Sequence, residues 1–136
     1  MPRVLDDKII DPLPDAAFAL HVTPNLPSGI FASRTGPLMA AADKLIVTIT
    51  GRGGHASAPQ DAVDPIPVAC EIVTALQTMG TRRIPAFDPV VMTVAQITAG
   101  TTNNIIPETA HLLGTIRSFS EGSRTLAHQG LHRVVT

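Results

Sequence analysis

The chain has 136 residues, of which 44% are hydrophobic and 15% charged, and its formal net charge is -1. This composition supplies one modest hydrophobic core and excludes a disordered polar tail. The Lys and Arg residues form no basic stripe, so nucleic acid and anionic membrane surfaces are excluded as partners. The single cysteine excludes an internal disulfide framework. No apolar run reaches the roughly 20 residues of a membrane span, and the acidic start lacks the apolar centre of a signal peptide, so we expect a cytoplasmic protein.

The first 37 residues are rich in proline, which breaks any long helix. We expect this segment to form short extended pieces. Residues 16–22 (AAFALHV) are its best strand candidate. The prolines concerned are Pro2, Pro12, Pro14, Pro24, Pro27 and Pro37.

A strand followed by a helix is predicted in the middle of the chain. Residues 44–50 (KLIVTIT) alternate between apolar and polar side chains, as in a strand with one buried face. Asp64 can cap a helix whose first residue, Pro65, stands where a missing N–H costs nothing. Apolar residues then recur at steps of three and four as far as Gly80, which predicts an amphipathic helix. They are Ala69, Ile72, Val73, Leu76 and Met79.

Two more strands and a second helix complete the predicted elements. Residues 89–97 (PVVMTVAQI) are rich in β-branched side chains, residues 99–108 turn the chain, and residues 110–118 alternate again. A helix is expected from about Ser120, with an apolar stripe that ends at Val135. The fold class is therefore α+β: an antiparallel sheet with two helices on one face, in the ferredoxin-like order strand, helix, strand, strand, helix, with the last strand missing.

The segment GRGGHASAP (residues 51–59) places three glycines, an arginine and a histidine directly after the first predicted strand. It lacks the Gly-Lys-Ser/Thr of a phosphate-binding loop and the glycine spacing of a dinucleotide fingerprint. On its own it predicts a tight turn that needs positive φ, with an exposed histidine.

Four stretches considered together carry more information than this segment alone. They are ALHVTPNLPSG (19–29), GRGGHASAPQDAVDPI (51–66), GTTNNIIPETA (100–110) and GTIRSF (114–119). In this order and at these spacings they resemble the amidohydrolase and aminoacylase branch of the M20 metallopeptidase family, which includes hippurate hydrolases and auxin-conjugate hydrolases. With RTGPLMAAAD (34–43), the resemblance covers nearly the whole chain.

The resemblance implies a catalytic domain with two divalent metals, interrupted by a smaller lid or dimerisation domain. We expect residues 1–39 to be a remnant of the catalytic domain and its linker, and residues 40–136 to be the lid, truncated at its C-terminal end. The family's Cys-x-His and Glu-Glu motifs should precede residue 1, and its last histidine ligand should follow residue 136. We therefore expect zinc, manganese or cobalt in the full-length enzyme, no metal bound by this chain alone, and no catalysis by it alone.

The same resemblance implies roles for four residues. His21, in the family's HV motif, corresponds to a metal ligand. His55 corresponds to the histidine that reaches into the active site of the dimer partner and stabilises the oxyanion formed when metal-bound water attacks the amide. Asn104 corresponds to a substrate-binding asparagine, and Arg117 to the arginine that grips the substrate carboxylate. The alternatives are an ordinary turn residue for Asn104 and a solvated strand residue for Arg117.

The remaining histidines and the cysteine match no site of the family. His111, His128 and His132 are expected to have surface or packing roles. Cys70, near the apolar stripe of the first predicted helix, is assigned to packing because no histidine lies at catalytic spacing from it.

The leading hypothesis is the dimerisation and lid part of a metal-dependent amidohydrolase that cleaves N-acyl amino acids and works as a homodimer, paired through the second strand and the first helix. The alternative is a free-standing dimeric interaction module that has lost the catalytic domain. A third interpretation, an unrelated ferredoxin-like ligand-binding domain, explains the element order but not the four motifs.

Overall fold

A computed structural model describes residues 11–12 and 14–136 of the chain. The chain divides into two units, Met1–Ser33 and Arg34–Thr136. Within the described residues, no helix is long and apolar enough to cross a bilayer.

The described part of the first unit contains no helix and no strand, so the strand predicted over residues 16–22 is wrong. A strand needs a neighbouring strand to accept and donate its backbone hydrogen bonds, and the described residues of this unit supply none. The apolar side chains that suggested the strand are exposed, with Phe18 at 97% and Val22 at 87% of full exposure. An apolar run alone does not provide a partner strand.

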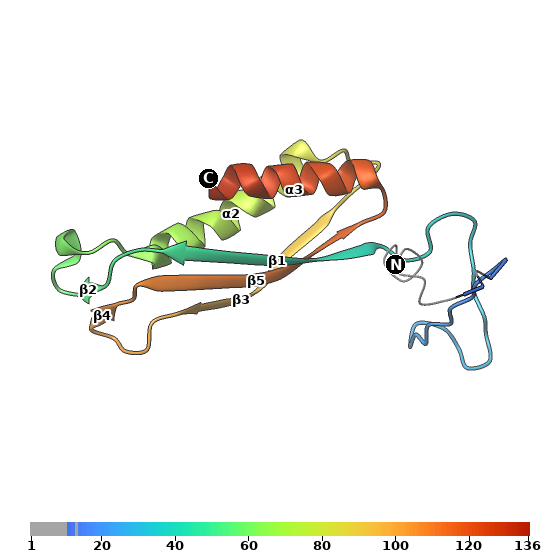
Figure 1. The fold of residues 1–136 in the computed structure, drawn as a ribbon, viewed down its shortest axis with the longest axis horizontal. Helices are drawn as coiled ribbons and strands as arrows, with labels where there is room; N and C mark the ends of the chain where they lie inside the picture. Colours follow the sequence, from blue (N-terminus) through green and yellow to red (C-terminus); the bar gives the residue numbers. More distant parts are fainter. Residues whose placement is uncertain (1–10, 13) are drawn as a thin grey trace. The chain divides into compact units, whose positions relative to one another are not determined.

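The second unit is a three-stranded antiparallel sheet with two helices on one face (Figure 1). The strands are β1 (Ala41–Thr50), β3 (Val91–Ala99) and β5 (Thr109–Ser118), in the order β1-β5-β3. The helices are α2 (Pro65–Arg83) and α3 (Glu121–Val135). A second, two-stranded sheet pairs β2 (Gly54–His55) with β4 (Ile105–Ile106), and a short 3-10 helix, η1, spans Pro59–Asp61. The predicted α+β fold class is confirmed.

Helix α2 begins where its capping residues predict. The side chain of Asp64 accepts a hydrogen bond of 2.9 Å from the backbone N–H of Ile66, and Pro65 is the first helical residue. The helix continues past Gly80 to Arg83, where two arginines in the last turn complement the negative end of the helix dipole.

Helix α3 is held at its start by serine and aspartate side chains. Ser120 caps it by accepting a 3.0 Å hydrogen bond from the backbone N–H of Ser123. The Ser123 hydroxyl donates to both the backbone oxygen and the carboxylate of Asp88, at 2.7 Å each. Asp88 therefore ties the loop before β3 to the first turn of α3. Hydrogen bonds donated by the hydroxyl of Ser120, and secondarily by that of Ser123, lower the pKa of its carboxyl group.

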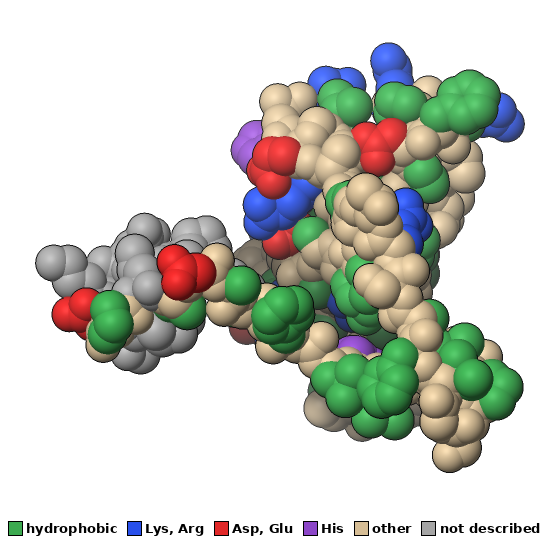
Figure 2. Space-filling model, turned by 90° about the vertical axis from the view of Figure 1, so that its right-hand side faces the viewer, with side chains coloured by type: hydrophobic (Ala, Val, Ile, Leu, Met, Phe, Trp, Pro, Cys, Tyr) green, Lys and Arg blue, Asp and Glu red, His purple; other side chains and the backbone are tan. Residues whose placement is uncertain are grey.

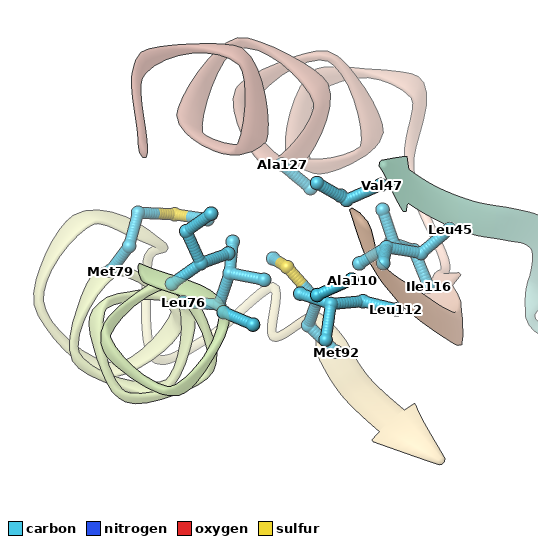
Figure 3. Close-up of a cluster of buried hydrophobic side chains, with 11 residues drawn as sticks. Leu45, Val47, Leu76, Met79, Met92, Ala110, Leu112, Ile116 and Ala127 are labelled. Atoms are coloured by element: carbon cyan, nitrogen blue, oxygen red, sulfur yellow. The ribbon is translucent and has the colours of Figure 1, made fainter. Parts of the chain in front are cut away.

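The core lies between the sheet and the two helices and contains only aliphatic side chains, methionine and alanine. Figure 3 shows side chains from all three long strands and both helices converging there. All four phenylalanines are exposed by 49% or more, so the hydrophobic stabilisation of the fold comes from buried aliphatic side chains, Met and Ala. The cluster consists of Leu45, Val47, Ala69, Ile72, Leu76, Met79, Met92, Ala110, Leu112, Ile116 and Ala127.

Candidate functional site

The segments that carry His55 and Asn104 lie at one end of the long sheet, because the pairing of β1 with β5 continues beyond these strands. Thr50 pairs with Thr109, and the next residue, Gly51, donates its N–H to the oxygen of Glu108 at 2.8 Å. The small sheet of β2 and β4 follows, in which His55 pairs with Ile105. Figure 1 shows β2 and β4 together beyond the ends of β1 and β5.

One more backbone bond brings the two predicted site residues next to each other. The N–H of Ala56 donates to the backbone oxygen of Asn104 at 3.0 Å. His55 and Asn104 come from parts of the sequence almost fifty residues apart, and both have exposed side chains. Sequence reasoning assigned both residues to substrate chemistry, and the fold brings their segments into direct contact.

The glycines before His55 are needed for close backbone approach, not for a left-handed conformation. The glycines with positive φ among the described residues are Gly29, Gly36 and Gly100, so the predicted positive-φ turn at residues 51–54 is wrong. A Cβ atom on Gly51 would lie 2.1 Å from the backbone oxygen of Val63, a distance that real Cβ atoms essentially never show. Arg52 and Val63 exchange two backbone hydrogen bonds of 2.9 Å at this point. Glycine therefore allows the chain segment before His55 to pack directly on residues 62–63.

The His55 ring has a local partner that sequence reasoning missed. Nδ1 of His55 lies 3.2 Å from the backbone nitrogen of Ser57 and 2.7 Å from its hydroxyl oxygen. The sequence signal was a serine two residues after the histidine, because serine commonly bonds to groups two positions away.

Asn104 has a comparable partner. The hydroxyl of Thr102 donates to the side-chain oxygen of Asn104 at 3.1 Å. Within the described residues, the side-chain nitrogen of Asn104 has no protein hydrogen-bond partner, so both of its N–H donors face outward. Asn104 lies in a turn, as its ordinary role would require, and the Thr102 hydroxyl orients its amide group.

Arg117 lies near the opposite end of β5. It pairs with Ala42 on one side and Val91 on the other, and its side chain is exposed. Eight residues separate it from Thr109, which is about 27 Å along an antiparallel strand. The structure thus does not bring Arg117 together with His55 and Asn104 within one chain.

An ion-pair cluster lies near the Arg117 end and links β1 to α3. Arg124 binds Asp43 through two hydrogen bonds, Nε to Oδ2 at 2.7 Å and a terminal nitrogen to Oδ1 at 2.8 Å. These bonds hold the pKa of the Asp43 carboxyl group at about 2, and they raise the pKa of Arg124. Nε2 of His128 lies 3.2 Å from the same carboxylate. This cluster fixes α3 against the sheet, which gives His128 the surface role expected for it.

His21 belongs to the first unit. Its Nδ1 lies 2.7 Å from the backbone oxygen of Val22, and because a carbonyl can only accept, Nδ1 carries the proton; in the neutral ring Nε2 then holds the lone pair. Metal-binding histidines adopt this arrangement. A metal site nevertheless needs several ligands, and the described residues contain no group of three His, Cys, Asp or Glu side chains that could hold an ion. Within the part of the chain that the structure describes, His21 is therefore a single candidate ligand for the two-metal centre that the resemblance implies.

The remaining candidates have ordinary surroundings. His111 lies 3.3 Å from the hydroxyl of Thr48 on the exposed face of the sheet, and His132 is exposed on the last turn of α3. Cys70 is exposed on α2, so its assignment to packing is wrong. It follows Ala69, which faces the core, and the next helical position turns away from the core.

Comparison with known proteins identifies the fold. The family model described as "Peptidase dimerisation domain" (M20_dimer) matches residues 42–130. The chain belongs to the M20 peptidase family. The matching part is that family's dimerisation domain. It contains helix α2, most of α3 and, apart from Ala41, the whole three-stranded sheet.

Named relatives agree with this assignment. The chain is 39% identical over 122 residues to "Thermostable carboxypeptidase 2" of Saccharolobus solfataricus, covering 90% of this chain and 31% of the relative. It is 43% identical over 122 residues to "N-acetyldiaminopimelate deacetylase" of Bacillus subtilis, covering 90% of this chain and 33% of the relative. The chain thus spans about a third of the length of these curated relatives.

A solved structure shows the same fold. The Bacillus subtilis YXEP protein, described as a dinuclear metal-binding peptidase of the M20 family, superposes with a TM-score of 0.66 at 29% identity, over 98% of this chain and 32% of that protein.

Proposed function

We propose that this chain is the dimerisation and lid part of a metal-dependent amidohydrolase that cleaves the amide bond of small N-acyl amino acids. Similarity to an enzyme named as an N-acetyldiaminopimelate deacetylase supports the substrate class, because its name describes an acyl group on an amino acid. Residues 40–136 would be the lid. Residues 1–39 would belong to the catalytic domain and its linker, with His21 as one ligand of a divalent metal such as zinc, manganese or cobalt. A cytoplasmic location is part of the same proposal, since one unpaired cysteine suits a reducing compartment.

The observation that carries the proposal is the separation of the predicted site residues. His55 and Asn104 lie at one end of the sheet, and Arg117 lies about 27 Å away along β5. A small N-acyl amino acid cannot touch both ends of one chain. If all three residues act on the same substrate, each active site must use the His55 end of one chain and the Arg117 end of another, which requires a dimer.

Exposed apolar side chains support a dimer interface on β3 and α2. In the described residues β3 forms an edge of the sheet, and Val91 and Ile97 on it are exposed by 59% and 50%. On α2, Ile66 and Val68 are exposed by 39% and 46%. Hydrophobic side chains at the surface are visible in green in Figure 2. Pairing of two β3 edges would bury these residues and satisfy the free backbone groups of both edges.

The chemistry of the three side chains fits their proposed tasks. When water attacks the amide, negative charge grows on the carbonyl oxygen, and N–H donors from His55 and Asn104 would stabilise it. The guanidinium of Arg117 would bind the substrate carboxylate through two parallel hydrogen bonds. The dimer partner would therefore supply the groups that act on the scissile bond, and the chain's own sheet would supply the group that anchors the substrate.

A graft into a related enzyme tests the proposal. The matching segment of the Bacillus subtilis deacetylase is replaced by residues 40–136 of this chain, and hydrolysis of N-acetyldiaminopimelate is measured. We expect an active dimer. His55→Ala should lower kcat about 100-fold or more, as the loss of an oxyanion donor does, and Arg117→Ala should mainly raise KM. His132→Ala is the matched control, since this exposed histidine has no proposed role.

Two results would contradict the proposal. If the graft dimerises but His55→Ala and Arg117→Ala have no more effect than His132→Ala, these residues do not act in catalysis. If the isolated chain dimerises and no graft supports hydrolysis, the free-standing interaction module becomes the better interpretation. Sedimentation velocity of the isolated chain measures the dimer independently of activity.

A further inference from the structure

The two contacts at Nδ1 of His55 determine where its proton lies. The backbone N–H of Ser57 is a hydrogen-bond donor in every protonation state, and it points at Nδ1 from 3.2 Å. A protonated Nδ1 would direct a second N–H against it. An unprotonated Nδ1 accepts from this group and also from the Ser57 hydroxyl at 2.7 Å. In the neutral ring the proton must therefore be on Nε2.

We propose that Ser57 is a positioning residue that holds His55 in the tautomer with the proton on Nε2. The Nε2–H group then faces outward as a donor, while Nδ1 is occupied. This inference rests on the proposed function only for the reason why the tautomer matters: a developing oxyanion requires a hydrogen-bond donor, which Nε2–H is. The tautomer itself follows from the geometry within this chain.

The backbone around His55 supports this arrangement. His55 is paired with Ile105, Ala56 donates to Asn104, and the N–H of Ala58 donates to the oxygen of His55 at 2.9 Å. These three backbone interactions thus fix the turn that carries Ser57. Because the turn is fixed, the ring and the serine keep their relative orientation although both side chains are exposed.

The polar groups at this end of the sheet have a common property. The Asn104 side-chain oxygen accepts from Thr102, which leaves its N–H groups outward, and the Ser57 contacts leave the His55 Nε2–H outward. Both side chains then have N–H donors that no protein acceptor occupies within the described residues. This is the polarity that suits an oxygen with growing negative charge, and it would be lost for the histidine in the other tautomer.

The test is a two-bond proton–nitrogen NMR spectrum of the isolated 136-residue chain above about pH 8, where imidazoles are neutral. We expect the His55 signals to show one tautomer, with a pyrrole-type Nε2 and a pyridine-type Nδ1. The other four histidines are internal controls in the same spectrum, and the His55→Gln variant identifies the His55 signals. A mixture of tautomers at His55 in the wild-type chain would overturn the inference.

Two variants separate positioning from general disruption. Ser57→Ala removes the shorter, hydroxyl contact but keeps the backbone N–H at Nδ1, so the tautomer with the proton on Nε2 should remain the major form and a minor form with the proton on Nδ1 should become detectable. Ser57→Thr keeps the hydroxyl and should restore the wild-type pattern. In the graft, Ser57→Ala should lower kcat by about 10-fold with little change in KM, as loss of a group that orients a functional histidine does. An unchanged His55 spectrum in Ser57→Ala, with unchanged kcat, would refute a positioning role for the side chain.

The outcomes for this inference and for the proposed function are distinguishable. One tautomer at His55 together with an active His55→Ala graft would retain the positioning by Ser57 and reject the catalytic role of His55. A tautomer mixture together with an inactive His55→Ala graft would reject the positioning and retain the catalytic role.

Discussion

Replacement of Gly51 by alanine tests whether close backbone approach explains the glycines before His55. The new Cβ would lie 2.1 Å from the oxygen of Val63, whereas ordinary contacts begin near 3.4 Å. The two segments must therefore separate by about 1 Å, which strains the two hydrogen bonds between Arg52 and Val63. Overpacking and the weakened bonds together should cost about 2–4 kcal/mol of unfolding free energy. For a folded unit of this size, the Tm should fall by roughly 10–20 °C.

Gly80→Ala is the matched control, because a Cβ at this helical position meets nothing within 4 Å. It should stabilise α2 by about 0.5–1 kcal/mol, since alanine has less backbone freedom to lose. Thermal unfolding followed by circular dichroism measures both variants. If Gly51→Ala melts at the wild-type temperature or above it, the close approach at Val63 is not a constraint and our explanation of this glycine is wrong.

Three further variants test the fold. Asp43→Asn should lower the unfolding free energy by about 1–2 kcal/mol at pH 7, because it removes the ion pair with Arg124. Since the pKa of Asp43 is lowered to about 2, this difference from wild type should persist above pH 4 and vanish as the pH falls to about 2. Urea unfolding across that pH range measures it. Leu76→Ala should lower the unfolding free energy by about 2–5 kcal/mol, because Leu76 is fully buried, and an unchanged urea midpoint would contradict the core assignment. Asp64→Ala should cost about 1 kcal/mol by removing the cap of α2, and Asp64→Ser, which can still accept the N–H, should recover most of it in the same assay.

Local patterns predicted the long elements well. Asp64, Pro65 and the apolar spacing behind them specify the start and the buried face of α2, because capping and periodicity act within a few residues. The alternation in residues 110–118 likewise gives the buried face of β5, where Ala110, Leu112 and Ile116 are buried. These features depend on neighbours in the sequence, so the sequence displays them directly.

Features that depend on distant partners were missed or misinterpreted. The small sheet of β2 and β4 joins segments about fifty residues apart. Only the register of β1 and β5 indicates this pairing, because the two segments follow directly on the pair Thr50 and Thr109. The role of Gly51 depends on the approach of Val63, which no local pattern reveals. Residues 16–22 form an apolar run that suggests a strand but have no strand beside them in the described part of their unit.

The sequence indicated which residues belong to the candidate site, but not how these residues are arranged in space. The motif resemblance selected His55, Asn104 and Arg117, and it could not reveal that Arg117 lies at the other end of β5. Ser57 and Thr102 were overlooked because their partners are only two residues away and such short polar contacts occur in many turns.

The central claim is that one active site uses the His55 end of one chain and the Arg117 end of another, and mixed dimers of the graft test it most directly. His55→Ala and Arg117→Ala grafts are unfolded together, refolded and assayed at a substrate concentration far below the raised KM of Arg117→Ala, where each graft alone has little activity. We predict recovery of about a quarter of the unmutated activity, because half of the dimers are mixed and each mixed dimer has one intact site. The pair His55→Ala and Asn104→Ala should recover none, since both residues come from the same end of one chain. Recovery from this second pair, or none from the first, would contradict the account.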